Sequence, residues 1–97
     1  MKLQEALDRV EQMGDEDVIF ARKLWTLESD AEIGALDTDL RVPSSVIAQG
    51  LAYFLEASVA NEALEVFGTY EATIGERRAL LLFYAENDAF PEWVYGR

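Results

Sequence analysis

The stretch DVIFAR (17–22) decides the fold class, because it is short, apolar and rich in β-branched and aromatic residues. These properties are typical of a buried strand. A second, weaker strand is predicted at AEIGALD (31–37), and KLWTLESD (23–30) connects the two. An antiparallel hairpin with a long loop is the simplest pairing. Because two strands alone are only marginally stable, we expect helices to cover one face of this hairpin.

Helices are predicted on both sides of the hairpin. Apolar residues recur at helical spacing over 2–13, and a glycine follows as a stop signal. VPSSVIAQG (42–50) predicts a second helix, since proline is tolerated at a helix start and serine caps it. The capping box TIGE (73–76) predicts a last helix, which fades at 87–89 because Pro91 cannot continue it.

The stretch LAYFLEASVANEALEVFG (51–68) fits two structures. Read as a helix, its apolar residues form one continuous stripe that Gly68 ends, and its alanines favour the helix. Read as a strand, residues 52–59 alternate between two faces, Gly50 is the break, and the sheet gains a third member. The helix accounts for the longer pattern and is favoured over the strand.

The predicted fold class is therefore α+β, a small antiparallel sheet of two or three strands with helices packed mainly on one face. About half of the residues are apolar, which argues against intrinsic disorder. A chain of 97 residues is expected to form one compact acidic domain over 1–97.

The last residues, FPEWVYGR (90–97), lie beyond the last helix and yet carry several large apolar side chains. A free tail would expose these side chains to water, which monomeric proteins avoid. We expect the tail to fold back over the core with Trp93 buried and Glu92 outside. The alternative is a partner-binding anchor, a role for which tryptophan and tyrosine are well suited.

The chain contains no cysteine and no histidine. The first absence excludes disulfides and thiolate chemistry, and the second removes the usual zinc ligand and the usual general base near neutral pH. No cofactor is expected. The N-terminal segment has no apolar run of signal-peptide length, and no stretch approaches the ~20 apolar residues of a membrane span. A cytoplasmic location is therefore predicted.

Net charge is the strongest global property of the chain. Nineteen acids against eight bases give −11, and residues 24–76 contain ten of these acids with Arg41 as the one base. Such a field repels nucleic acid and anionic membranes, and it steers association with basic surfaces. The plainer interpretation is that the acidity serves solubility.

The strongest candidate for a functional surface is WTLESDAEIGALDTD (25–39). In an extended chain, residues two apart point to the same side, roughly 6.5–7 Å from each other. Carboxylates at that interval form a ridge broadly like the phosphates of one nucleic-acid strand, with a tryptophan as apolar anchor. The alternative is a charged edge that prevents strand-to-strand aggregation. The predicted partner-binding residues are Trp25, Glu28, Asp30, Glu32, Asp37 and Asp39.

Two other chemistries fit these acids less well. As a calcium loop beginning at Glu28, the stretch has its tight-turn glycine one place late, so no metal site is predicted. Glu86, Asp88 and Glu92 lie near aromatics and leave a paired-carboxylate hydrolase formally open. No other residue type supports that pair, so the chain is not expected to be an enzyme.

Three segments resemble a family of small bacterial proteins of unknown function. They are DVIFARKLWTLESDAEI (17–33), YFLEASVANEALEVF (53–67) and YAENDAFPEWV (84–94), and the similarity extends over most of the chain between the first segment and the last. The resemblance implies a compact domain that is bacterial, plasmid-encoded or phage-encoded. It supplies no catalytic residues and no ligand.

The sequence therefore predicts a non-catalytic acidic binding protein that occupies a basic or nucleic-acid-binding surface of a partner. An inhibitor or immunity protein of a nuclease, toxin or CRISPR effector is typical of this class, as is a nucleic-acid mimic. Direct binding of nucleic acid or membrane is not expected. The alternative is a structural or assembly module that homodimerises through apolar surface, and a small hydrolase ranks last.

Overall fold

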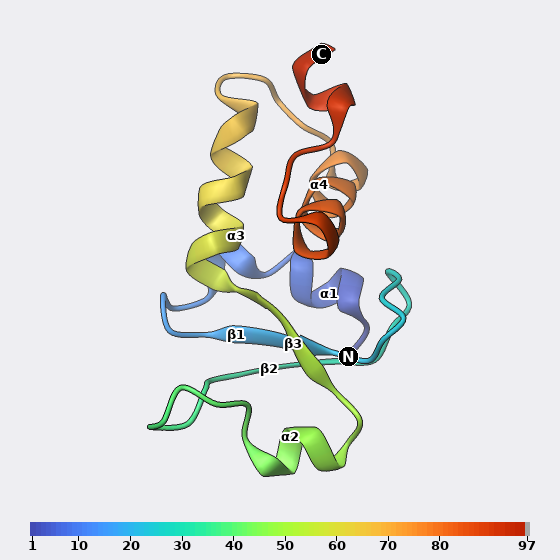
Figure 1. Cartoon of the computed structure of the whole chain (residues 1–97). Helices are drawn as coiled ribbons and strands as arrows, with labels where there is room; N and C mark the ends of the chain where they lie inside the picture. The colour runs from blue at the N-terminus through green and yellow to red at the C-terminus, as the bar shows by residue number, and fades with distance from the viewer. Residues whose placement is uncertain (97) are drawn as a thin grey trace.

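Three antiparallel strands form the sheet in the computed structural model, which describes residues 1–96 (Figure 1). Strand β1 (Val18–Ala21) is central and pairs with β2 (Ala31–Gly34) on one side and with β3 (Ala52–Glu56) on the other. All residues of β1 are buried, because both faces of the sheet are covered. The predicted α+β class and the predicted hairpin are confirmed.

The ambiguous stretch 51–68 contains both a strand and a helix. Strand β3 (52–56) runs directly into helix α3 (Ala57–Leu64), which tightens into the 3-10 turn η2 (Glu65–Phe67) and stops at Gly68. The helix favoured for the whole stretch is therefore wrong for 52–56, where the strand interpretation holds. Pairing with β1 gives these backbone groups hydrogen-bond partners that outweigh local helix propensity.

A register shift in β3 interrupts the alternation of buried and exposed side chains along this strand. Ile19 lies opposite Leu55 and Phe20 lies opposite Tyr53, which leaves Phe54 as the extra residue of a bulge. Such a bulge allows two consecutive side chains to point towards the core. Phe54 and Leu55 are accordingly both buried.

The N-terminal helix is shorter than predicted. Helix α1 covers Leu3–Leu7, and a separate 3-10 turn, η1, covers Val10–Gln12, so the continuous helix expected over 2–13 is wrong. The α-helical pattern gives way to 3-10 hydrogen bonding where the N–H of Arg9 donates to the carbonyl of Ala6, three residues earlier, at 3.1 Å. The break still leaves the apolar side chains of both pieces buried.

The other two helices begin where the sequence places them. Helix α2 (Ser44–Ala48) is a short helix after the proline, and α4 (Ile74–Asn87) starts at the predicted capping box. In that box the N–H of Glu76 donates to the Thr73 hydroxyl at 3.1 Å, and the Thr73 N–H donates back to the Glu76 carboxylate at 2.9 Å. Helix α4 ends at Asp88, which adopts a left-handed conformation.

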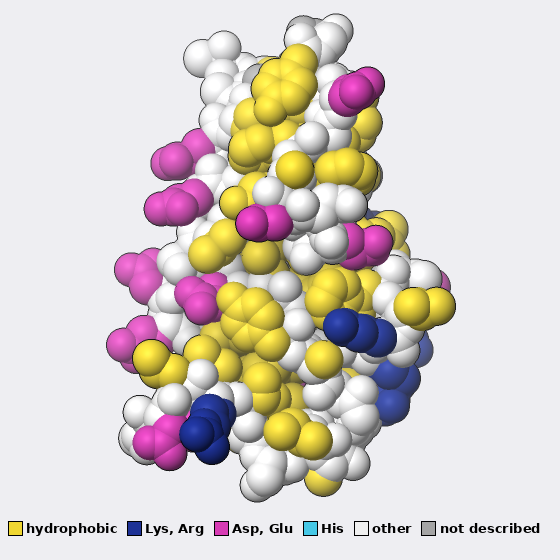
Figure 2. Space-filling model, viewed as in Figure 1, with side chains coloured by type: hydrophobic (Ala, Val, Ile, Leu, Met, Phe, Trp, Pro, Cys, Tyr) yellow, Lys and Arg dark blue, Asp and Glu magenta, His cyan; other side chains and the backbone are white. Residues whose placement is uncertain are grey.

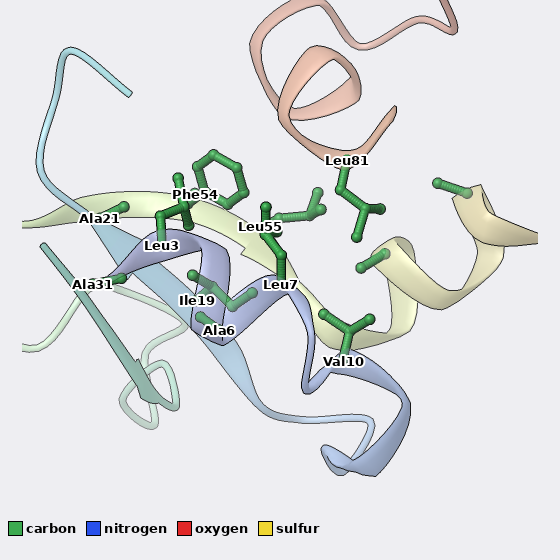
Figure 3. Packing of buried hydrophobic residues seen from close by; sticks show 12 residues of the cluster. Leu3, Ala6, Leu7, Val10, Ile19, Ala21, Ala31, Phe54, Leu55 and Leu81 are labelled. Atoms are coloured by element: carbon green, nitrogen blue, oxygen red, sulfur yellow. The ribbon is translucent and has the colours of Figure 1, made fainter. Parts of the chain in front are cut away.

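The core lies mainly on one face of the sheet. Helices α1, α3 and α4 cover that face, whereas α2 covers the opposite face through a smaller cluster (Figure 1). Figure 3 shows side chains from α1, the sheet and α4 meeting in the main cluster. A third cluster closes the far end of α3 and α4. The main cluster includes Leu3, Leu7, Val10, Ile19, Phe54, Leu55 and Leu81.

The C-terminal segment folds back as predicted, but a different residue is buried. The 3-10 turn η3 (Glu92–Gly96) places Val94 at 0% exposure against Phe67 and Leu80, whereas Trp93 is 41% exposed. The predicted burial of Trp93 is therefore wrong, while Glu92 is exposed as expected. Three residues per turn place Val94 on the same side as the buried Pro91. Arg97 lies outside the described residues.

Two arginines of α4 fasten this helix to the N-terminal segment. Arg77 pairs with Glu11, and the Nε of Arg78 donates to Asp8 Oδ1 at 2.9 Å. The Arg78 hydrogen bond holds the pKa of Asp8 below its ordinary value of 3.8. Within residues 1–96, no helix has the length and apolar character needed to cross a membrane.

The Asp8–Arg78 pair predicts a small pH dependence of stability. Because the pKa of Asp8 is lower in the folded chain, the stabilisation is complete above about 3.8 and disappears as pH falls through the lowered folded value. Asp8→Asn should cost at most about 1 kcal/mol at neutral pH, since the carboxylate is partly exposed and screened by solvent. Urea melts should show this difference shrinking below pH 3.8.

A matched control is Asp15→Asn, which removes the same charge from an exposed position. A gap between wild type and Asp8→Asn that is equally large at strongly acid pH would contradict the role of the pair.

Candidate functional site

The predicted acidic ridge is not one extended strand. Extended backbone begins at Asp30, which bridges to Lys2, and continues through β2. Glu28 lies in the preceding turn, where its N–H donates to the hydroxyl of Thr26 at 3.2 Å. Glu28 is exposed, but the regular interval predicted between it and the next two acids does not hold.

Asp37 and Asp39 lie in a second turn, beyond the end of β2. The Oδ1 of Asp37 accepts the backbone N–H groups of Asp39 and Arg41, both at 3.0 Å, and these bonds hold the turn closed. Asp39 itself is exposed. The predicted alternation of Asp37 and Asp39 along an extended chain is therefore wrong, because an aspartate that bonds the backbone two residues on forms a turn.

The central acids of the ridge are engaged within the molecule. Asp30 lies 3.2 Å from the Nζ of Lys2 and 3.6 Å from the Nε of Arg22, and the Lys2 hydrogen bond lowers the pKa of Asp30. The carboxylate of Glu32 accepts a hydrogen bond from the Gln49 amide at 3.1 Å. These two acids fasten neighbouring segments to β2, but only the charge of Asp30 is compensated by bases, because the amide of Gln49 is neutral.

Trp25 is a half-buried residue at the margin of the core. Its ring packs edge-to-face on Phe54 at 4.8 Å, and its Nε1 donates to the carbonyl of Ala21 at 3.2 Å. The Nζ of Lys23 lies 5.0 Å from the centroid of the same ring. A shallow hollow of about 270 Å³ exposes the rest of the ring beside Glu86. Trp25 therefore has a packing role, with one accessible edge.

A larger cavity, which the sequence did not predict, lies where β1 begins and β3 ends. Its volume is about 470 Å³, and among the predicted site residues it contains only Asp37. Its walls combine carboxylates with aliphatic side chains such as Val18 and Leu36, and among residues 1–96 no lysine or arginine lines it. We call it the acidic cavity. Its acidic residues are Asp15, Glu16, Asp37 and Glu56.

Glu56 connects the acidic cavity to helix α3, because it is the residue that precedes this helix. Burial, and then the Glu56 carboxylate, raise the pKa of the Tyr53 hydroxyl above 10.0, its ordinary value. Farther along, Glu62, Glu65 and Glu71 are exposed; we call them the α3 row. Figure 2 shows acidic side chains along the edge of the molecule that α3 forms in Figure 1.

The acidic cavity draws its acids from segments far apart in the chain. Asp15 and Glu16 precede β1, Asp37 follows β2, and Glu56 ends β3. Antiparallel order brings these strand ends to the same edge of the sheet. In the sequence, the cavity is marked only by acids that stand next to strand ends. Because Glu56 ends β3, this pattern cannot be seen while residues 52–56 are assigned to a helix.

Metal and hydrolase chemistry receive no support from the arrangement of the acids. Within residues 1–96, no group of three or more carboxylates is placed to hold a metal ion. Glu86 and Asp88 lie at the end of α4, and Glu92 begins the 3-10 turn that follows. All three side chains are exposed, so the described structure does not enclose them in a substrate cleft.

Comparison of the chain with protein-family models, curated proteins and solved structures gives no significant match. The resemblance to small bacterial proteins therefore rests on the three quoted segments alone. Function has to be inferred from the geometry and charge of the described residues.

Proposed function

We propose that the chain is a non-catalytic acidic binding protein that occupies a basic surface of a partner macromolecule. The partner would be a nuclease, a toxin or a CRISPR effector, and the chain would act as its inhibitor or immunity protein. The observation that supports this proposal is where the excess charge lies. Ion pairs within residues 1–96 engage Asp8, Glu11 and Asp30.

These paired acids belong to the N-terminal segment and the start of β2. By contrast, the acidic cavity and the α3 row form no ion pair among the described residues, so no base there neutralises their charge. Carboxylates without counterions repel one another and attract cations over roughly 10 Å at moderate salt. Part of the uncompensated charge thus runs from the acidic cavity along α3 on one side of the molecule, where a basic surface can dock, while exposed acids elsewhere, such as Glu86 and Asp88, add to the overall charge.

Mimicry of nucleic acid remains part of the proposal in a modified form. The predicted ridge had regular spacing, and the structure replaces it with a broader acidic side that lacks a regular repeat. The acidic side would then resemble nucleic acid in its density of negative charge and not in the spacing of its charged groups. Electrostatic complementarity of this kind contributes mainly to the association rate and to partner choice.

Two triple variants test the position of the binding charge. Neutralising the α3 row (Glu62→Gln, Glu65→Gln and Glu71→Gln) should weaken binding to an arginine-rich peptide about tenfold at low salt, since several exposed carboxylates act together. The matched control, Glu28→Gln with Asp30→Asn and Glu32→Gln, removes three charges as well. It should weaken binding less, because Asp30 is already paired with Lys2 and Arg22 within the molecule.

Fluorescence anisotropy over a salt series measures both effects, and cross-linked capture from host lysate over the same series then seeks the natural partner. Equal losses for the two triple variants would show that only total charge matters. Binding that is unchanged by salt would contradict the proposed function itself.

The assembly module is the second candidate, and exposed aromatics at the end of the molecule favour it. Trp93 is 41% exposed and Tyr95 is 72% exposed. Homodimerisation through them would bring two chains of charge −11 together, so it should strengthen with salt. Sedimentation velocity separates the two candidates, because binding to a basic partner weakens with salt.

A further inference from the structure

The far end of the molecule presents aromatic rings packed against a buried ring. Phe67 is 4% exposed, and its centroid lies 6.0 Å from the ring of Tyr70 and 6.2 Å from the ring of Trp93. Tyr70 and Trp93 are each 41% exposed, and Tyr95 follows in the same turn. We call Tyr70, Trp93 and Tyr95 the aromatic tip. Figure 2 shows apolar surface at this end, with acidic side chains beside it.

The aromatic tip is held in place by the core beneath it. Phe67 packs with Leu80 and Val94, which are both 0% exposed. The hydroxyl of Tyr70 donates to the carboxylate of Glu76 at 2.7 Å, which fixes the orientation of that ring. Rings that are already ordered lose little conformational entropy when a ligand covers them, so they suit an anchoring role.

The charge around the aromatic tip selects for a cation. Glu65, Glu71 and Glu92 are exposed on the same segments as the rings, and no lysine or arginine occurs in 42–76 or 79–96. A guanidinium can lie over an aromatic face while it hydrogen-bonds a neighbouring carboxylate. A second copy of this chain carries a net charge of −11, so it fits the acidic rim less well than a basic partner does.

We propose that the aromatic tip is the anchor for an arginine-bearing segment of the basic partner. The inference rests on the proposed function, and it adds the residues that supply apolar contact and the side-chain type they receive. Arginine is favoured over lysine because its planar group stacks on rings and binds carboxylates through two nitrogens. Long-range attraction would come from the acidic side, and the rings would add short-range affinity.

The test compares two exposed rings of similar accessibility. Trp93→Ser removes a ring of the tip, whereas Phe83→Ser removes a 39% exposed ring from the side of α4. The probes are an arginine-rich peptide and its lysine counterpart, titrated by anisotropy at low salt. We expect Trp93→Ser to weaken binding of the arginine peptide about 5- to 30-fold, and binding of the lysine peptide less. Phe83→Ser should leave both affinities unchanged.

Thermal melts of both variants accompany the titrations, and similar melting temperatures are expected because the two rings are exposed to nearly the same degree. If Trp93→Ser binds like wild type while the α3-row variant is weakened, the anchor is overturned and the proposed function stands. If neither Trp93→Ser nor the α3-row variant changes binding and salt has no effect, the anchor and the proposed function are both overturned. A wild-type dimer that Trp93→Ser dissociates, with unchanged peptide affinity, would instead assign the aromatic tip to a second copy.

Discussion

Val94→Asp is expected to destabilise the chain by at least about 3 kcal/mol, because it places an unpaired carboxylate in the cluster formed with Phe67 and Leu80. Small domains are stable by only about 5–15 kcal/mol, so this loss should lower the melting temperature by many degrees. Deletion of 90–97 should have a comparable effect, since it removes Val94 and uncovers the same cluster.

The neighbouring substitution Trp93→Asp is the matched control, because it adds the same charge one residue away at a position that is 41% exposed. It should cost about 1 kcal/mol or less. Urea or thermal melts of the two variants measure the difference. Equal stability of both would show that the C-terminal turn does not close the core.

Phe54→Ala should cost about 3–5 kcal/mol, the usual loss when a buried aromatic ring is truncated to alanine. Phe54 is 2% exposed, occupies the bulge of β3 and supports the ring of Trp25 at 4.8 Å. The variant should therefore also shift Trp25 fluorescence to longer wavelength. A background of Trp93→Phe leaves Trp25 as the one reporting tryptophan.

The adjacent residue provides the control. Tyr53→Ala truncates a ring that is 38% exposed in the same strand, so its cost should be much smaller and Trp25 fluorescence should not move. Similar losses for both positions would contradict the burial pattern of the bulge.

Short-range signals were enough to predict much of the fold. The hairpin follows from two nearby β-rich stretches, and the Thr73–Glu76 box marks the start of α4 within four residues. For the β3 stretch the helix was favoured over the strand. Its pairing partner β1 is more than thirty residues away, so the local sequence does not show the pairing that stabilises the strand. Helix propensity then dominated the local pattern, and the bulge at Phe54 obscured the alternation.

The candidate site was predicted less well, because its residues are assembled by strand order. Asp37 is the one predicted residue that reaches the acidic cavity, and Glu56 was not recognised since it was assigned to a helix. Trp93, which was expected to be buried, is 41% exposed, and Val94 is buried instead. The direction of each side chain depends on the 3-10 turn, which the sequence does not mark.

The direct passage from β3 into α3 has a mechanical consequence. The strand ends at Glu56 and the helix begins at Ala57, so no linker residue separates them, and we expect a change in the direction of the strand to move the helix with it. At about 1.5 Å per residue, the helix extends about 12 Å, so a tilt of about 10° at its base displaces its far end by about 2 Å. We therefore expect the strand and the helix to move together as one rigid unit. A partner that binds at the acidic cavity and tilts β3 would therefore displace the end of α3 that lies near the aromatic tip. Distance measurements between spectroscopic probes attached at the two sites would detect this displacement.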